Sequence, residues 1–270
     1  RIKILGRMNV AEKRKPQDGR LKTRTPKGQE TELRLSTLPT AFGEKLVMRI
    51  FDPEVLVRSF QQLGFEGHLL SDWQALTSHK QTTTLYSSLK QLATEQVNVC
   101  TIEDPIEMLE PSFNQMQVNT GIDLGFADGV RALMRQDPDI IMVGEIRDHD
   151  TANMAIQAAL TGHLVLSTLH TNDAPSSLTR LHDLGVQPFL TAATILGVLA
   201  QRLVRRLCPH CKVEKQINSQ EWEHLTFDYI MEMPEKVFTA VGCEECRQTG
   251  YKGRVGIYEF MPVSLEAKQL

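Results

Sequence analysis

The feature that most constrains this fold is an alternation of short apolar runs with helical patterns between residues 83 and 184. Short, continuously apolar strands that alternate with helices are typical of a parallel sheet buried on both faces. The sequence therefore predicts an α/β fold, with Asp148 or Asp150 capping the helix that ends before Gly162. The predicted strands cover residues 97–102, 140–143 and 164–168, and the predicted helices cover residues 83–95, 126–135, 152–160 and 176–184.

Length and composition exclude several classes of protein. The chain has 270 residues, of which 41% are apolar and 23% charged, which suits a globular protein and excludes a disordered, collagen-like or coiled-coil chain. The formal net charge is only −3, although residues 1–34 carry eleven basic and four acidic side chains, so we expect no stable nucleic-acid binding. The longest apolar stretch, residues 190–200, is too short to cross a bilayer, which favours an intracellular protein. Because the chain opens with Arg1, we expect a fragment of a longer protein.

Residues 1–50 show a different pattern, which predicts a small α+β region. Apolar spacing predicts a helix over residues 1–14, and Pro16 to Gly19 predicts a turn. Alternating side chains predict strands at 32–38 and 45–50, and we expect a linker over 51–62.

Four of the five cysteines form two Cys-x-x-Cys pairs, Cys208 with Cys211 and Cys243 with Cys246. Reducing compartments disfavour structural disulfides, so such pairs indicate a metal site. Two pairs supply a closed tetrahedral set of four thiolates, which suits structural Zn(II). The 31 residues between the pairs exceed a compact zinc ribbon, so this segment must fold back as an excursion. Four incidental cysteines are the alternative.

Acidic residues follow two of the predicted strands. Glu145 comes after strand 140–143, and Glu103, Asp104 and Glu107 come after strand 97–102. Ligands of open α/β sheets bind at the carboxyl ends of the strands. Carboxylates there can hold Mg(II) beside a triphosphate and orient an attacking water. A solvated loop glutamate explains Glu145 equally well when it is taken alone.

Two histidines stand at opposite ends of the predicted strand 164–168. His170 follows the strand and could sense phosphate, whereas His163 precedes it. A single histidine at a strand end is usually structural, and that alternative stays open for both.

Three segments of the chain carry recognisable motifs: Glu103-Asp-Pro-Ile-Glu107, Arg135-Gln-Asp-Pro-Asp-Ile-Ile-Met-Val-Gly-Glu-Ile-Arg-Asp148 and Thr161-Gly-His-Leu-Val-Leu-Ser-Thr-Leu-His-Thr171. They resemble the Asp box, Walker B motif and His box of the secretion ATPase superfamily. Ala11 to Arg20, Gln201 to Arg205 and the four cysteines narrow the resemblance to the type II secretion and type IV pilus assembly branch, the extension ATPases. The resemblance covers essentially the whole chain.

This resemblance implies a RecA-like P-loop NTPase motor domain over residues 63–200. Part of a regulatory N-terminal domain would precede it over residues 1–50. A tetracysteine zinc subdomain would follow over 201–258, with a truncated C-terminal segment over 259–270. The resemblance also implies a homohexameric ring in the cytoplasm, at the inner face of the bacterial inner membrane. The ring would join an inner-membrane platform protein and reach the membrane only through its partners.

The resemblance also assigns roles within an ATP and Mg(II) site. Glu103 would be the catalytic carboxylate that positions water, and Glu145 would serve the Mg(II) side. Arg34 and Arg49 are candidates to grip phosphate oxygens, because a guanidinium binds them in pairs and keeps its charge, although a surface arginine is the alternative for each. The remaining members of the implied nucleotide set are Asp104, Glu107, Asp139, His163, His170, Thr82 and Thr83.

The chain departs from the family at the phosphate-binding loop. The family carries a strand and loop of the type G-L-I-L-V-T-G-P-T-G-S-G-K before a T-T-T-L-Y segment, whereas here Thr82 follows directly on His79-Lys80-Gln81. A block of about 13 residues is therefore absent, and no glycine occurs between Gly67 and Tyr86. Such a loop cradles phosphates with successive backbone N–H groups, so its loss predicts poor ATP binding.

Three origins of the gap stay open: a natural degenerate copy, an error or excision, and omission of an unobserved loop. The close fit of the gap to the edges of the motif favours a real deletion. The sequence thus predicts a secretion or pilus assembly ATPase that is impaired in ATP binding. The alternatives are a non-hydrolysing structural subunit of the same ring and, least favoured, a zinc module that binds nucleic acid.

Overall fold

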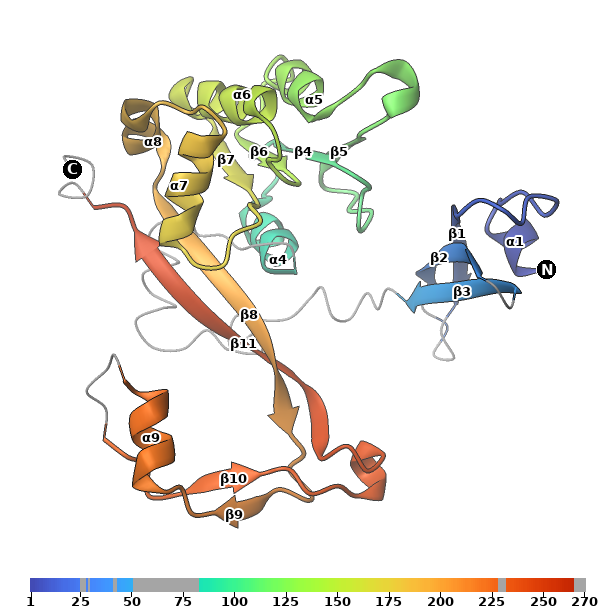
Figure 1. Cartoon of the computed structure of the whole chain (residues 1–270). Helices are drawn as coiled ribbons and strands as arrows, with labels where there is room; N and C mark the ends of the chain where they lie inside the picture. The colour runs from blue at the N-terminus through green and yellow to red at the C-terminus, as the bar shows by residue number, and fades with distance from the viewer. Residues whose placement is uncertain (25–27, 29, 41–42, 51–82, 228–231, 265–270) are drawn as a thin grey trace. The chain divides into compact units, whose positions relative to one another are not determined.

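The computed structural model describes residues 1–264 apart from 25–27, 29, 41–42, 51–82 and 228–231 (Figure 1). The chain divides into two compact units, each treated by itself below. The sheet unit contains, of the described residues, 1–50, 83–146 and 161–168, and the ribbon unit contains 147–160 and 169–264. The predicted linker over 51–62 and the predicted site residue Thr82 lie outside the described residues.

A four-stranded parallel sheet forms the centre of the sheet unit. Its strands are β4 (Val99–Glu103), β5 (Asn114–Gln117), β6 (Ile140–Val143) and β7 (Leu164–Ser167). They lie in the order β5-β4-β6-β7, and all three neighbouring pairs are parallel. This arrangement confirms the predicted parallel sheet, to which β5 is an addition.

The two faces of this sheet carry different helices. Val99, Thr101 and Glu103 alternate onto one face, where Leu85, Tyr86 and Leu89 of α4 (Thr83–Leu92) pack with Val99, Ile140, Met142 and Leu166. The opposite face meets α5 (Phe126–Leu133), and a Cβ atom at Gly129 of α5 would lie only 2.6 Å from Cδ1 of Ile102. Figure 1 shows α4 and α5 on opposite sides of β4 and β6. The alternation along β4 therefore turns Glu103 toward α4.

The N-terminal part of the sheet unit is a three-stranded antiparallel sheet. The strands predicted at 32–38 and 45–50 are confirmed as parts of β2 (Glu30–Thr40) and β3 (Gly43–Ile50). The predicted helix over 1–14 is wrong in extent, because α1 (Ile2–Leu5) ends at Gly6. The predicted turn at 16–19 is also wrong, since Gln17 opens β1 (Gln17–Arg24). A Cβ atom at Gly19 would lie 2.3 Å from the Gly6 carbonyl oxygen, so a glycine is needed where β1 passes the end of α1.

The ribbon unit is built around a long antiparallel pair, β8 (Gly197–Leu207) and β11 (Tyr251–Pro262). The predicted excursion between the cysteine pairs is confirmed, because β9 (Val213–Lys215) and β10 (Val237–Thr239) pair antiparallel within it. Asp148 caps the N-terminus of α6 (His149–Leu160) by accepting the Thr151 N–H at 2.8 Å. The remaining elements are α7 (Pro175–Asp183), α8 (Pro188–Thr194), α9 (Ser219–Leu225) and the short 3₁₀ helix η3 (Glu244–Cys246). A further 3₁₀ turn, η2 (Thr120–Ile122), belongs to the sheet unit.

Among the described helices, none combines the length and the apolar character that a membrane span requires.

Candidate functional site

The carboxylate of Glu103 lies at the carboxyl end of β4 and is only 3% exposed. Its oxygens accept hydrogen bonds from the Tyr86 hydroxyl at 2.8 and 2.7 Å and from Thr101 Oγ1 at 2.7 Å. Longer contacts come from Gln115 Nε2 at 3.3 Å and from the Glu107 N–H at 3.4 Å. Burial of a charge costs several kcal/mol unless donors compensate it, and this set of donors holds the carboxylate in one position.

The turn after β6 is fixed at the same edge of the sheet. The Gly144 N–H donates to the Ile102 carbonyl at 2.8 Å, and a Cβ atom on Gly144 would lie 3.5 Å from Cα of Glu103. Thr168 at the end of β7 donates its hydroxyl to the Gly144 carbonyl at 2.7 Å. Glu145, which is partly exposed, therefore follows a residue that touches Glu103. The structure brings the segments that carry these two predicted acids together.

Glu107, the third acid of this edge, pairs with Arg34. Nη1 of Arg34 lies 3.1 Å from Oε1 of Glu107, and Nη2 lies 3.0 Å from Oε2. Nη2 also donates to the Ile106 carbonyl at 3.3 Å. A guanidinium that meets both carboxylate oxygens forms one of the stronger charge-assisted contacts in proteins.

Three arginines line up across the N-terminal sheet. The strand register places Arg20 opposite Arg34, and Arg34 opposite Arg49, so all three lie on one face. Arg20 donates to Oε1 of Gln117 at 3.4 Å. Three adjacent positive charges repel one another, so this row of arginines is stabilised by anionic groups that bind to it. Sequence reasoning missed Arg20, because a strand at 17–24 was not predicted and the register follows only from the pairing.

Two predicted members of the nucleotide set lie at the other end of the sheet. Oδ2 of Asp139 accepts the Asn98 N–H at 2.7 Å, at the amino ends of β4 and β6. His163 precedes β7, where Nδ1 lies 3.0 Å from Thr161 Oγ1. The structure does not bring Asp139 or His163 to the edge that carries Glu103.

The other predicted members are dispersed among the described residues. Asp104 is exposed directly after β4, and Arg49 is exposed on β3. Thr83 opens α4, and His170 is exposed in the ribbon unit.

The segment after His170 is held within the ribbon unit by its two long strands. Nη2 of Arg202, from β8, donates to the Asn172 carbonyl at 2.7 Å. Oε2 of Glu259, from β11, accepts the Ala174 N–H at 3.0 Å. The segment that follows the predicted His box is therefore attached to both strands of the ribbon.

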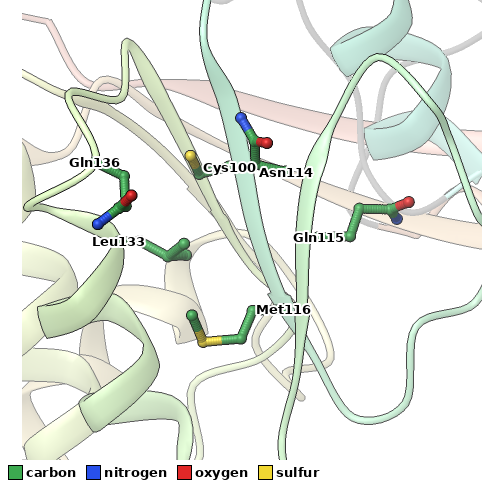
Figure 2. A pocket seen from close by; sticks show the side chains of 6 residues that line it. All are labelled: Cys100, Asn114, Gln115, Met116, Leu133 and Gln136. Carbon is green, nitrogen blue, oxygen red and sulfur yellow. The ribbon is translucent and has the colours of Figure 1, made fainter.

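A cavity of about 360 Å³ lies beside Cys100, on the face of β4 opposite Glu103. Figure 2 shows Gln115 pointing away from the other labelled side chains, toward the side on which it meets Tyr86. Cys100 is fully buried, and burial raises the pKa of its thiol, so this cysteine is unreactive. The lining residues are Cys100, Asn114, Gln115, Met116, Leu133 and Gln136.

The four predicted zinc ligands converge in the ribbon unit, where their sulfur atoms all lie within 4.8 Å of one another. Cys208 follows β8, Cys243 caps the N-terminus of the helix η3, and Cys246 is the last residue of this helix. The Sγ–Sγ distances are 3.9 Å for Cys208 with Cys243, 3.8 Å for Cys211 with Cys246 and 3.7 Å for Cys243 with Cys246. A tetrahedron with Zn–S bonds of about 2.3 Å has edges of about 3.8 Å, so the donor set fits zinc.

Backbone N–H groups support the charge of one of these sulfur atoms. Burial would raise the pKa of the Cys246 thiol, but the N–H groups of Cys243 and Gly250 and two neighbouring thiols outweigh it and lower the pKa to about 6. The two N–H groups lie 3.2 and 3.1 Å from Sγ of Cys246. His210, between the first two cysteines, is exposed.

Comparison with known proteins identifies the family of this chain. The whole chain, residues 1–270, matches the family described as Type II/IV secretion system protein. The chain belongs to this family. This membership agrees with the resemblance seen in the motifs.

Curated relatives share much of the sequence. The chain is 80% identical to a protein of Acinetobacter baylyi named Type IV pilus assembly ATPase TfpB, and 46% identical to the Type II secretion system protein HxcR of Pseudomonas aeruginosa. Both alignments take in 100% of this chain, which spans about half the length of these relatives, 48% and 56%. Each alignment runs over 283 residues, 13 more than the 270 of this chain.

Solved structures agree on the fold. The chain is similar to the pilus retraction motor PilT with bound ADP, with a TM-score of 0.63 and 24% identity over 95% of this chain and 66% of that one. It is also similar to the ATPase DotB of Yersinia pseudotuberculosis, with a TM-score of 0.65 and 19% identity over 94% of this chain and 63% of that one. The mixed α/β fold is therefore that of secretion ATPases.

Proposed function

We propose that this chain is the motor portion of a cytoplasmic ATPase of type II secretion or type IV pilus assembly, which couples ATP hydrolysis to the extension of a pilus or pseudopilus and to protein export. The observation that carries the proposal is the meeting of Glu103, the Glu145 turn and the Arg34–Glu107 pair within one unit of a chain of this family. In this reading, residues 63–200 are the RecA-like ATPase domain and 201–258 the zinc subdomain.

Each acid and base has a role in this proposal. Glu103 orients the attacking water, and Glu145 offers an oxygen ligand on the side of Mg(II), an ion that prefers such ligands. Arg34 and Arg49, now joined by Arg20, bind phosphate oxygens when nucleotide releases Arg34 from Glu107. His170 responds to the state of the phosphates. Bound Mg(II) neutralises the charge that develops on the phosphates.

The absence of a phosphate cradle leads us to propose that ATP binding by this chain is impaired. Two observations support this: the relatives' alignments contain 13 positions beyond this chain's length, and no glycine occurs between Gly67 and Tyr86. A phosphate-binding loop depends on glycines, because its backbone N–H groups must approach the phosphates closely. The same observations favour the second candidate, a non-hydrolysing structural subunit of the same ring.

The assembly that we propose is a homohexamer at the inner face of the bacterial inner membrane. Zinc, held by the four cysteines, fixes an arm that meets an inner-membrane platform protein. Association with the membrane is then peripheral and depends on partners.

Restoring the loop tests the proposal. The thirteen residues of the family loop are inserted between Gln81 and Thr82, and phosphate release and ATP-dependent thermal stability are compared with those of the present chain. We expect release to rise by about 100-fold or more, because preorganised donors act directly on the transferred phosphate. Glu103→Gln in the restored chain should retain the thermal shift with ATP and lose about 10²–10⁴-fold in release.

The outcomes separate the two candidates. Equal release by the restored and the present chains would refute the impairment. Oligomers that ignore ATP in both chains would favour the structural subunit.

A further inference from the structure

The Tyr86 hydroxyl is a buried titratable group that the proposed roles leave unused. The side chain is fully buried, and its oxygen lies within 2.8 Å of both carboxylate oxygens of Glu103. It also lies 3.0 Å from the Met108 carbonyl oxygen and 2.9 Å from Gln115 Nε2, which donates to it. The hydroxyl has one hydrogen to give, and an ionised carboxylate forms a stronger hydrogen bond than a carbonyl group.

We propose that Tyr86 is a positioning residue for Glu103, which fixes this carboxylate and attaches it to helix α4. The role of Glu103 in orienting water rests on the proposed function, whereas the bond itself rests on the contacts above. Tyr86 is the fourth residue of α4, which begins at Thr83. Tyr86 therefore links the water-orienting acid to the first turn of α4.

The environment keeps Tyr86 a donor at every working pH. Burial, and after it the negative charge of Glu103, raise the pKa of Tyr86 well above its ordinary value. The phenol thus stays protonated and cannot become a second buried anion beside the carboxylate. Thr101 and Gln115 complete the set of side-chain donors, so the loss of Tyr86 leaves Glu103 buried with a weaker set.

The geometry of the neighbours keeps both groups in place. Tyr86 packs 6.1 Å, centroid to centroid, from the ring of Phe113. Lys90, one turn later on α4, pairs with Glu110 at 2.6 Å. The ring and the helix are thus both anchored to the segment that follows β4, and the hydroxyl has little freedom to turn away from Glu103.

NMR of the Glu103 carboxyl group tests the proposal without relying on ATP hydrolysis. The full chain is labelled with ¹³C at the glutamate carboxyl groups, Glu103 is assigned with Glu103→Gln, and its carboxyl signal at neutral pH is compared between the native chain and Tyr86→Phe. We expect Tyr86→Phe to shift and broaden the Glu103 signal, because the carboxylate loses a donor and moves more freely. Tyr258→Phe is the control, because Tyr258 is partly buried but lies in the ribbon unit, and it should leave the Glu103 signal unchanged.

A second measurement does not depend on the folding of Tyr86→Phe. With ¹³C at tyrosine Cζ, Glu103→Gln should shift the Tyr86 signal, because an amide replaces the carboxylate that accepts the hydroxyl hydrogen, while the signal of Tyr258 stays constant. A Tyr86 signal that ignores Glu103→Gln, or an unchanged Glu103 signal in folded Tyr86→Phe, would overturn the proposal.

The same variants separate this inference from the proposed function. In the chain with the loop restored, Tyr86→Phe should lower phosphate release while it retains the thermal shift with ATP. If the Glu103 signal shifts while no variant releases phosphate, the positioning role is supported and the proposed ATPase activity fails.

Discussion

The tetracysteine cluster and the carboxylate edge of the parallel sheet differ in what each requires from the rest of the chain. The cluster has its whole donor set within 4.8 Å, from two short turns of the ribbon unit. The carboxylate edge has an acid, a second acid nearby and an arginine, but no glycine occurs in the sequence between Gly67 and Tyr86 to form the phosphate loop that our proposed function requires. A closed metal site is complete once its ligands meet, whereas a nucleotide site depends on backbone from another part of the sheet.

The two sites also differ in how their groups are held. Each cysteine pair is fixed by a local turn, as in the Cys211 N–H that meets the Cys208 carbonyl at 3.4 Å. Glu103 is held instead by side chains from three elements, α4, β4 and β5. The cluster should therefore fail as a whole when one ligand is lost, while the carboxylate edge should weaken by degrees.

The largest effect is expected from loss of a zinc ligand. Cys246→Ser, or removal of metal by a chelator, should lower bound zinc at least tenfold from one ion per chain and expose residues 208–250 to protease, because structural zinc supplies much of the folding energy of a small metal site. Elemental analysis and limited proteolysis measure both. Cys100→Ala, a buried cysteine outside the cluster, is the control and should keep its zinc. Full zinc content in Cys246→Ser would show that the cluster is not the site.

An intermediate effect, on the free energy of unfolding, is expected from overpacking the core of the sheet unit. Gly129→Val places a side chain against Ile102, whose Cδ1 is already 2.6 Å from the position of a Cβ atom. We expect the free energy of unfolding to fall by about 2 kcal/mol, as in other overpacked cores, with zinc content unchanged. Urea unfolding measures the loss.

Gly125→Ser is the matched control for this change. A Cβ atom at Gly125 meets nothing within 4 Å, and serine suits the N-cap of α5 that this residue occupies, so stability should stay within about 0.5 kcal/mol. A loss of zinc in Gly129→Val would contradict the separation of the two sites.

Most of the parallel sheet could be predicted from the sequence, because its central strands are mostly apolar. Ile140–Val143 is buried along its whole length, and so is Val99–Glu103. The edge strand β5 could not be predicted, since Asn114–Gln117 reads Asn-Gln-Met-Gln and has no apolar alternation. Strand β1 was missed for a related reason, because charged residues fill half of Gln17–Arg24.

The candidate site could be predicted only in part, because residues that are close in the sequence can lie at opposite ends of a strand. Asp139 and Glu145 belong to one motif, but the four residues of β6 separate them, and a strand of that length spans about 13 Å. The side chains that hold Glu103 were also beyond prediction. Tyr86 reaches Glu103 only because the acid lies on the face of β4 that packs against α4. Strand register and helix packing together decide which face that is.

The smallest effect is expected from the Lys90–Glu110 pair, which joins α4 to the segment after β4. Burial would raise the pKa of Glu110, but hydrogen bonds from Lys90 and Ser112 and the charge of Lys90 outweigh it and lower the pKa. A carboxyl group with a lowered pKa in the folded state stabilises the fold above its ordinary pKa, and this contribution disappears as the pH falls through the folded value.

Lys90→Met should therefore cost less than about 1 kcal/mol at neutral pH, because the lysine is partly exposed, and almost nothing at an acidic pH at which Glu110 is protonated in the folded chain. Urea unfolding at the two pH values measures the difference. The matched control is Lys215→Met, whose 3.4 Å pair with Glu221 has both side chains about half exposed and should matter at neither pH. An equal cost of Lys90→Met at both pH values would mean that the lysine acts through packing of its methylene groups, and the attachment of α4 beside Glu103 would then be apolar rather than ionic.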